Sequence, residues 1–389
     1  MENFNFKNST RLIFGKDTHE EAGKYIKDYS KKILLHYEGD GSLIKKLGIY
    51  DKVVKSLEDN GIEYIAFGGV VPNPRLSLVY EGIEICKKNN IDFILAVGGG
   101  SVIDSAKAIS LGAAYEGDVW DFFTGKNQPE VSLNVGVILT IPGSGSEMSE
   151  SSIISDEKTS MKCVCDTEKN FPVFSILDPQ VCFTIPPYLM GCGITDIMSH
   201  LMERYFSQTS DTQLSDALLE AAMKIVVEFG PKVIKEPRNY NNCVQIMWAA
   251  TIAHNGMIAA GRAADWASHR IEHEISAIYD ITHGAGMAIV FPAWMEYVKD
   301  ENIERFSEFA IKVFGVKADE DKEKTALRGI IELKKFFKHL KMKTSLGEAE
   351  IGEENFEVMA EKALAGNRTL GRFKKLTKED IVNILKMSK

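Results

Sequence analysis

Three of the eight histidines in the sequence, His269, His273 and His283, lie between residues 268 and 284. The first two are four residues apart in a segment whose isoleucines recur with helical spacing, so they share one face of a predicted helix. The next helix is expected to begin near Thr282, which places His283 in its first turn. There the helix dipole disfavours imidazolium, and a histidine that binds a metal must be neutral. This position therefore favours metal coordination.

A carboxylate and a fourth histidine, Asp196 and His200, repeat the four-residue spacing earlier in the chain. One such pair is usually an ordinary hydrogen bond, and a single histidine on an apolar face is more often a core residue than a ligand. Together, one carboxylate and two or three imidazoles form a ligand set suited to Fe²⁺ or Zn²⁺, and no cysteines show zinc-ribbon spacing. The pattern predicts a catalytic metal site and leaves open whether His269 or His273 is the ligand.

A run of three glycines, Gly98, Gly99 and Gly100, follows the apolar segment IDFILAV, and a helix is predicted from Ser101. Glycine amides can close on a phosphate, and a helix N-terminus adds a partial charge of about +0.5. The spacing differs from the G-x-G-x-x-G fingerprint, so a tight turn without a ligand is an equal alternative. Ser101 and Asp104 have capping-box spacing, which favours a capping role for Asp104 over a cofactor contact.

A second segment of small residues, 140–147, follows another apolar run in VGVILTIPGSGSE. Its glycines and serines let a ligand approach the backbone closely and offer hydroxyl donors. Two such segments at the ends of neighbouring parallel strands would lie on one edge of a sheet, where open α/β sheets bind ligands. Together the two segments predict a nucleotide site.

Two acidic residues, Glu38 and Asp40, follow the apolar segment KKILLHY. A carboxylate at the end of a strand beside a nucleotide accepts a hydrogen bond from the ribose 2′-hydroxyl and repels a 2′-phosphate. The two residues therefore favour NAD(H); the alternative is that both carboxylates simply face water.

The elements that must position these residues divide the 389-residue chain into two domains, as its length suggests. Up to residue 186, short apolar runs alternate with amphipathic segments, which predicts an α/β domain with a parallel sheet covered on both faces. The diprolyl segment FTIPPYLMG ends this pattern. We expect a dinucleotide-binding domain at residues 1–186 and an all-helical domain for metal and substrate at residues 187–389.

Composition disfavours several other classes of protein. The net charge of −9 and the lack of a basic stripe argue against nucleic acid as a partner. No apolar run approaches the roughly 20 residues of a membrane span, and the N-terminal segment lacks the features of an export signal. The six cysteines show no paired pattern, as expected for reduced thiols in the cytoplasm.

Three segments, GGGSVIDSAKAIS, GITDIMSHLMERYFS and SHRIEHEISAIYDITHGAGMAIVFPAWMEY, resemble the iron-containing, group III alcohol dehydrogenases. The likeness covers essentially the whole chain and is closest to the branch of butanol dehydrogenases and aldehyde reductases. It implies the dehydroquinate synthase-like architecture, with an active site in the cleft between the domains, and a homodimer. It also implies a divalent ion, with Fe²⁺ favoured over Zn²⁺, bound by Asp196, His200, His269 and His283, while His273 lies near the substrate.

The resemblance also implies a set of cofactor contacts. Carried onto this sequence, they are Asn73, Gly98, Gly99, Gly100, Ser101, and Thr140 with its neighbours Ile141 and Ser144. Asp104 is a further candidate for a cofactor contact, because of its position after the glycines and not because of the resemblance. Two departures from the family concern the cofactor. Many relatives have a threonine-rich version of TIPGSGSE. Many butanol-branch relatives, which tend to use NADP(H), have plain glycines where this chain has Glu38-Gly39-Asp40, and this leaves NAD versus NADP unresolved.

The function expected from these observations is hydride transfer between nicotinamide C4 and a primary alcohol or aldehyde of the butanol type. His273 would relay a proton to solvent or orient a ligand. Trp266 and Phe206 could line the substrate channel, although aromatic residues at helical spacing are more often core. Alternatives are a polyol or glycerol-type dehydrogenase, a phosphate-eliminating cyclase, for which the segment NGMIAAGRAADW offers only Arg262 as a basic group, and a metal-binding protein without catalysis.

Overall fold

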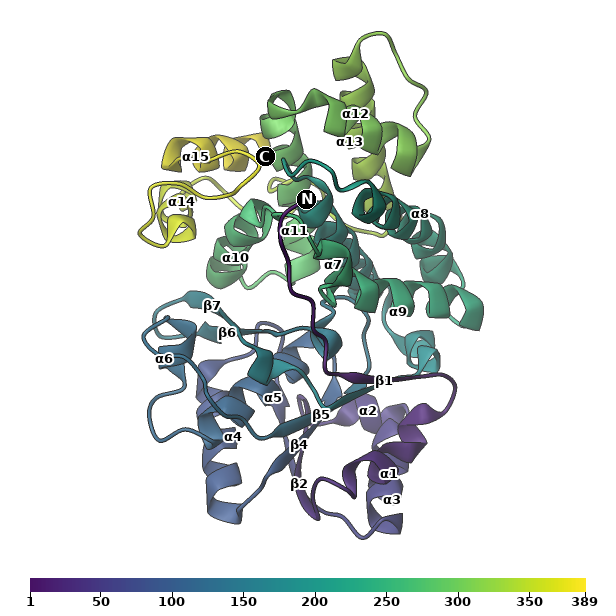
Figure 1. The fold of residues 1–389 in the computed structure, drawn as a ribbon, viewed down its shortest axis with the longest axis vertical. Coiled ribbons are helices and arrows are strands. Elements are labelled where there is room, and N and C mark those ends of the chain that lie inside the picture. The colour runs from purple at the N-terminus through teal and green to yellow at the C-terminus, as the bar shows by residue number, and fades with distance from the viewer. The chain divides into compact units, whose positions relative to one another are not determined.

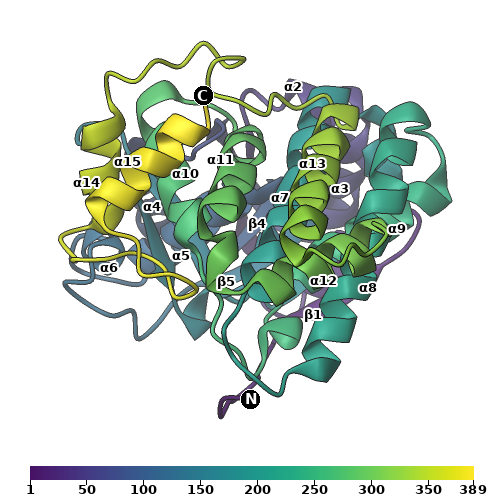
Figure 2. The same cartoon turned by 90° about the horizontal axis from the view of Figure 1, so that it is seen from above.

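The computed structural model describes all residues from 1 to 389, and the chain divides into two compact units. One unit comprises residues 7–185, and the other comprises residues 186–389 together with residues 1–6. The boundary falls at the diprolyl segment. In Figure 1 and Figure 2 the first unit runs from purple to teal, and the second runs mainly from teal to yellow. None of the helices combines the length and apolar character that a membrane span requires.

The unit of residues 7–185 is built on a six-stranded sheet in which every pairing is parallel, in the order β1-β8-β5-β4-β2-β3. Its strands are β1 (Arg11–Phe14), β2 (Lys32–Glu38), β3 (Glu63–Val70), β4 (Phe93–Gly98), β5 (Asn134–Leu139) and β8 (Phe174–Leu177). All residues of β4 are buried because helices cover both faces of the sheet. The predicted parallel sheet is confirmed, and the apolar segments KKILLHY, IDFILAV and VGVILTIPGSGSE supply most of the residues of β2, β4 and β5. Two short strands, the edge strand β1 and its neighbour β8, have only four residues each and were not predicted.

Helices flank this sheet on both sides, with α1 to α3 on one side and α4 and α5 on the other (Figure 1). They are α1 (Ala22–Ile26), α2 (Ser42–Lys46), α3 (Ile49–Asp59), α4 (Leu76–Asn89), α5 (Gly100–Ala113) and α6 (Trp120–Phe123). An antiparallel hairpin of β6 (Ser151–Asp156) and β7 (Met161–Asp166) follows the sheet strand β5, and β6 packs on α5. Helix α5 is therefore buried almost throughout, including its polar residues Ser105 and Lys107.

The second unit contains no strand, as its helical periodicity predicted. Its helices are α7 (Pro187–Tyr205), α8 (Gln213–Lys235), α9 (Tyr240–His254), α10 (Ala267–Tyr279), α11 (His283–Val298), α12 (Ile303–Phe314), α13 (Lys322–His339), α14 (Phe356–Leu364) and α15 (Lys378–Met387). Helix α9 ends earlier than the apolar pattern suggests, because Gly256 adopts a positive φ of 87° and starts a short 3₁₀ turn.

Helices α7 and α11 approach each other closely at Gly284, in the first turn of α11. A Cβ atom at this position would lie 2.9 Å from the Cα atom of Cys192 and closer still to its carbonyl group. Only glycine leaves room for this approach. As a result, the neighbouring His283 reaches to within 3.5 Å of Asp196 on α7.

Candidate functional site

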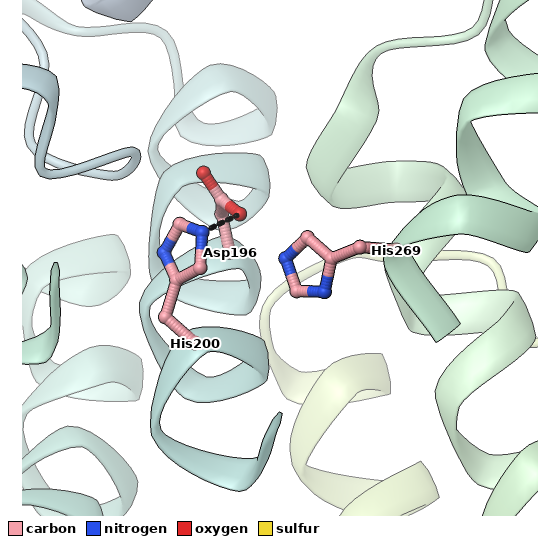
Figure 3. Close-up of side chains that lie close together, drawn as sticks. All are labelled: Asp196, His200 and His269. Atoms are coloured by element: carbon pink, nitrogen blue, oxygen red, sulfur yellow. Dashed lines mark ion pairs between the residues drawn. The ribbon is translucent and has the colours of Figure 1, made fainter. Parts of the chain in front are cut away.

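The predicted metal ligands converge from three helices of the second unit. Ligand atoms of Asp196 and His200 on α7 and of His269 on α10 all lie within 4.8 Å of one another. Figure 3 shows His269 pointing from its own helix toward the Asp196–His200 pair. The Oδ1 atom of Asp196 lies 3.7 Å from Nε2 of His200 and 3.5 Å from Nε2 of His283. One carboxylate oxygen thus faces two imidazoles, and His283 belongs to the same cluster.

These residues fit a divalent ion on their own chemistry. The Nε2 atom of His269 is buried and has no hydrogen-bond partner, a costly state for a polar atom unless a ligand occupies it. Burial, with a smaller effect of the neighbouring imidazoles, lowers the pKa of His200 well below its usual value. His200 is therefore neutral, as a metal ligand must be. The set of one carboxylate and three imidazoles matches the preferences of Fe²⁺ and Zn²⁺.

His273 occupies a different place from His269, although both lie on α10. It is buried, its ring centre is 5.5 Å from that of His283, and it groups with Glu272 and His283. The structure brings His269, and not His273, into the group with Asp196 and His200. This grouping favours His269 over His273 as the partner of Asp196 and His200, and the ligand assignment stays a prediction.

Three residues of this site were missed in the sequence. Glu203 Oε1 accepts a hydrogen bond from His269 Nδ1 at 2.7 Å, and Glu272 accepts one from His283 Nδ1. His254, at the end of α9, lies with its ring centre 4.3 Å from that of His200. Glu203 is seven residues after Asp196, so its place on the same helix face could have been recognised from spacing. Nothing in the sequence pointed to His254.

The two aromatic candidates for a substrate channel have different surroundings. Trp266 lies beside the cluster, with its ring centre 5.0 Å from that of His269. Phe206 is fully buried among other aromatic rings, among them Phe306 at 4.5 Å and Phe309 at 5.2 Å. Phe206 is therefore part of the hydrophobic core.

The contacts of Arg262 lie within its own unit. Its guanidinium group pairs with Asp216 and donates a hydrogen bond to the carbonyl oxygen of Arg204 at 2.7 Å. The only basic residue of the segment NGMIAAGRAADW thus makes internal contacts, which disfavours a phosphate-eliminating cyclase.

In the first unit, the glycine run joins β4 to the N-terminus of α5. The expected capping box is wrong, because the helix begins at Gly100 and no side chain caps its first turn. Asp104 instead accepts hydrogen bonds from Ser146 Oγ at 2.6 Å and from the backbone N–H of Ile153 at 3.2 Å. The segment after β5 offers the first donor and strand β6 offers the second, and the amides of the first turn of α5 have no side-chain partner. Such an N-terminus suits a phosphate.

The segment of small residues packs directly against the glycines. A Cβ atom on Gly100 would overlap the side chain of Ser144, and one on Gly99 would touch Ile141 at 3.4 Å. The hydroxyl of Thr140 is buried and has no hydrogen-bond partner. The glycines let the two segments approach closely, and the hydroxyl of Thr140 is left unsatisfied in a buried environment, so both segments fit a bound nucleotide. Ser101, in the first turn of α5, is half-buried.

A buried ammonium group fixes this segment. Lys107 Nζ donates to the backbone oxygens of Ser146, Ser149 and Ser151 and to the hydroxyl of Ser146, at 2.7 to 3.0 Å. Burial lowers the pKa of Lys107 to about 8 and raises that of Asp104 to about 6. No pattern in the sequence singled out Lys107.

Strands β2 and β4 are neighbours in the sheet, yet the chain leaves them in opposite directions, to β3 on one side and to β5 on the other. This is the topological switch point at which α/β sheets bind ligands. The Glu38–Asp40 loop after β2 and the glycine run after β4 therefore meet at one edge. Burial raises the pKa of Glu38, whereas Asp40 is exposed and a hydrogen bond from the Ser42 N–H lowers its pKa.

Asn73 lies in the loop after β3. It is buried, has a positive φ of 56°, and its side-chain oxygen accepts a hydrogen bond from Lys162 Nζ at 3.0 Å. Asparagine tolerates this left-handed conformation better than most residues.

None of the six cysteines forms a disulfide.

These features define a class of protein that combines a nucleotide-binding α/β unit with a helical unit carrying a buried cluster of metal-ligand residues. Comparison with known proteins agrees with this class. Residues 9–179 match the model described as iron-containing alcohol dehydrogenase, and residues 192–389 match that of the Fe-containing alcohol dehydrogenase family, C-terminal. The chain belongs to the iron-containing alcohol dehydrogenase family, which confirms the resemblance drawn from the three segments.

Several relatives match the full length of the chain. A probable NADH-dependent butanol dehydrogenase 1 of Bacillus subtilis is 44% identical over 389 residues, covering 100% of both chains. The crystal structure of an NADH-dependent butanol dehydrogenase A from Thermotoga maritima superimposes with a TM-score of 0.96 at 41% identity and covers 100% of this chain and 99% of that one. An NADPH-dependent aldehyde reductase of Escherichia coli is 33% identical over 90% of this chain and 89% of its own length.

The geometry of the cluster predicts that His269 is needed for metal binding. Purified protein should bind about one divalent ion per chain, and His269→Ala should weaken binding at least about a hundredfold, because it removes one nitrogen ligand. Competition against a chromogenic chelator measures the affinity. His339→Ala, which removes a surface histidine, is the control and should bind as the wild type does. Equal affinity in the His269 variant would contradict the assignment.

Proposed function

We propose that this chain is a metal-dependent alcohol dehydrogenase and aldehyde reductase that interconverts a primary alcohol and its aldehyde, of the butanol type, with NAD(H). The observation that carries the proposal is the buried group of Asp196, His200 and His269, with the half-buried His283 at 3.5 Å from Asp196, in a chain that also holds an uncapped glycine loop. The names of the relatives, NADH-dependent butanol dehydrogenase and NADPH-dependent aldehyde reductase, support the substrate class.

The ligand set explains how the chain can favour the reaction. When bound, the ion acts as a Lewis acid toward a carbonyl oxygen, and reduced nicotinamide supplies the hydride. Asp196 contributes one negative charge and the three neutral imidazoles contribute none, so a dication held by them keeps a net positive charge. Burial of these side chains excludes water, which strengthens the attraction for negative charge developing on the substrate oxygen.

His273 is proposed as the group that passes a proton between the substrate oxygen and solvent. It lies one helical turn from His269 and beside His283, without being part of the group formed by Asp196, His200 and His269. The alternative is that it orients a ligand.

Replacing His273 distinguishes these two roles. His273→Ala should retain the ion and lose about a hundredfold in kcat, the usual contribution of a positioned acid–base group. Steady-state kinetics and metal analysis of the same sample measure both quantities. A variant with unchanged kcat would end the relay hypothesis, and a variant that loses the ion would indicate an orienting role.

The activity itself can be tested with butanal and NADH. The absorbance of NADH should fall in the presence of butanal, a chelator should abolish the reaction, and added Fe²⁺ or Zn²⁺ should restore it, because the carbonyl is polarised only when an ion is bound. A metal-binding protein without catalysis would consume no NADH. A polyol dehydrogenase would oxidise glycerol faster than butanol in the reverse assay.

The preference for NADH over NADPH is attributed to Glu38 and Asp40, which follow β2 at the switch point. Their negative charges repel a 2′-phosphate and can accept hydrogen bonds from a ribose hydroxyl. Asp40 is the better target for mutation, because its exposed carboxylate can be neutralised without loss of the contact to Ser42.

Asp40→Asn keeps an oxygen that can accept the Ser42 N–H and removes one charge. The KM for NADPH should fall roughly tenfold relative to the KM for NADH, since electrostatic repulsion of the phosphate is reduced. Kinetics with both cofactors measure the ratio. Asp59→Asn, an exposed acidic residue at the end of α3, is the control. An unchanged ratio would show that Asp40 does not select the cofactor.

Three finer points complete the proposal: Fe²⁺ as the ion, a homodimer as the assembly, and the cytoplasm as the location. The first two are supported by the resemblance to the family, and the third by the sequence composition and the free cysteines.

A further inference from the structure

The carboxylate of Glu203 binds the start of helix α10 as well as a ligand histidine. It is fully buried; its Oε1 accepts hydrogen bonds from Nδ1 and the backbone N–H of His269, at 2.7 and 3.2 Å, and its Oε2 accepts one from the backbone N–H of Trp266 at 2.6 Å. An ionised carboxylate only accepts hydrogen bonds, so in the neutral form of the His269 ring, the form that can bind a metal, the proton lies on Nδ1. The lone pair is then on Nε2, the buried atom without a hydrogen-bond partner.

Glu272 repeats this arrangement one helix further along the chain. It is fully buried on α10 and accepts hydrogen bonds from Nδ1 of His283 and from the hydroxyl of Ser276. Gly286 on α11 makes room for it, since a Cβ atom there would lie 2.7 Å from Cγ of Glu272. The proton of the His283 ring is again placed on Nδ1, and Nε2 faces Asp196 at 3.5 Å.

The two contacts link the three helices that carry the cluster. Glu203 of α7 binds a histidine of α10, and Glu272 of α10 binds a histidine of α11. His200 has no such partner, because its Nδ1 is buried without a hydrogen bond. With Asp196, the two glutamates place three carboxylates in the interior of one unit, which is unfavourable unless cations offset them. A divalent ion at the cluster would do so.

We propose that Glu203 and Glu272 are positioning residues. They hold His269 and His283 in the tautomer whose Nε2 carries no proton, and so set the affinity of the site for its ion. This inference rests on the proposed metal site. It assigns a role to two residues that do not themselves bind the ion.

The test uses Glu272→Gln in the full-length protein, because glutamine keeps the shape of the side chain and removes its charge. Its amide can donate to Nδ1, which would move the ring proton to Nε2 and block the ligand atom. The affinity for Zn²⁺, measured by competition with a chromogenic chelator, should fall about 10- to 100-fold, as is typical for partners of metal-bound histidines. Glu203→Gln tests the same role at the second histidine.

A matched control is Glu274→Gln on the same helix. Glu274 is also buried, but its carboxylate pairs with Lys362 of α14 at 3.5 Å. Its replacement removes a buried charge at a comparable depth and should leave the Zn²⁺ affinity within about twofold of the wild type, since its carboxylate pairs with a lysine of α14.

A second measurement separates positioning from a merely structural effect. In metal-free protein labelled with ¹⁵N at histidine, the ring-nitrogen shifts report which nitrogen is protonated. The wild type should show protonated Nδ1 at His269 and His283, and each glutamine variant should change the tautomer of its own histidine only.

Each result decides the question. A loss of Zn²⁺ affinity with a changed tautomer supports the proposal, and unchanged affinity in both glutamine variants overturns it while the metal site stands. Weakened binding without a change of tautomer also overturns it. Failure of the wild type to bind any ion overturns both this inference and the proposed function.

Discussion

The structure of the helical unit depends on the burial of carboxylates beside imidazoles. A carboxylate removed from water is stable only when hydrogen bonds or positive charge replace its hydration. Asp196, Glu203 and Glu272 are all buried, and each faces a ring nitrogen of at least one histidine. The packing of α7, α10 and α11 follows from this requirement, because the groups that satisfy one another come from different helices.

Small residues allow the charged groups to meet. Gly284 lets α11 touch the backbone of α7, and Gly286 opens space for the side chain of Glu272. Both glycines lie near the start of α11, next to His283. Their cost in helix propensity, about 1 kcal/mol each relative to alanine, is offset by the contacts that the close approach permits. A sequence of small residues after a histidine is therefore part of the site.

The α/β unit also contains buried charged side chains that hydrogen bonds satisfy, and here they hold a loop in place. Lys107 and Asp104 are buried on α5, and their partners lie in the segment that follows β5. These bonds anchor the loop around Ser146 to the helix. Because Asp104 is used in this way, no side chain competes for the amides at the start of α5. A polar residue that looks like a cap in the sequence thus leaves the helix end available to an anion.

Much of this architecture was predictable from local patterns. The strands β2 to β5 have apolar runs, of which β2, β4 and β5 are largely buried, and the four-residue spacing of Asp196–His200 and His269–His273 fixes their helix faces. The glutamate partners were not predicted, because an acidic residue on an amphipathic helix normally faces water. The capping box was wrong because Ser146 and Ile153 of strand β6, both distant in sequence, supply the donors for Asp104. What local periodicity cannot reveal is which polar side chains meet across helices. In the proposed metal cluster, those contacts decide which ring nitrogens carry protons and which can bind an ion.

The same contacts couple ion binding to the packing of the helices. An ion that binds only the folded state stabilises it by about 2.7 kcal/mol at a hundredfold excess over Kd. Of the buried carboxylates that make the helical unit costly to fold, Asp196 is thus the proposed ligand, and Glu203 and Glu272 are the proposed partners of the ligand histidines.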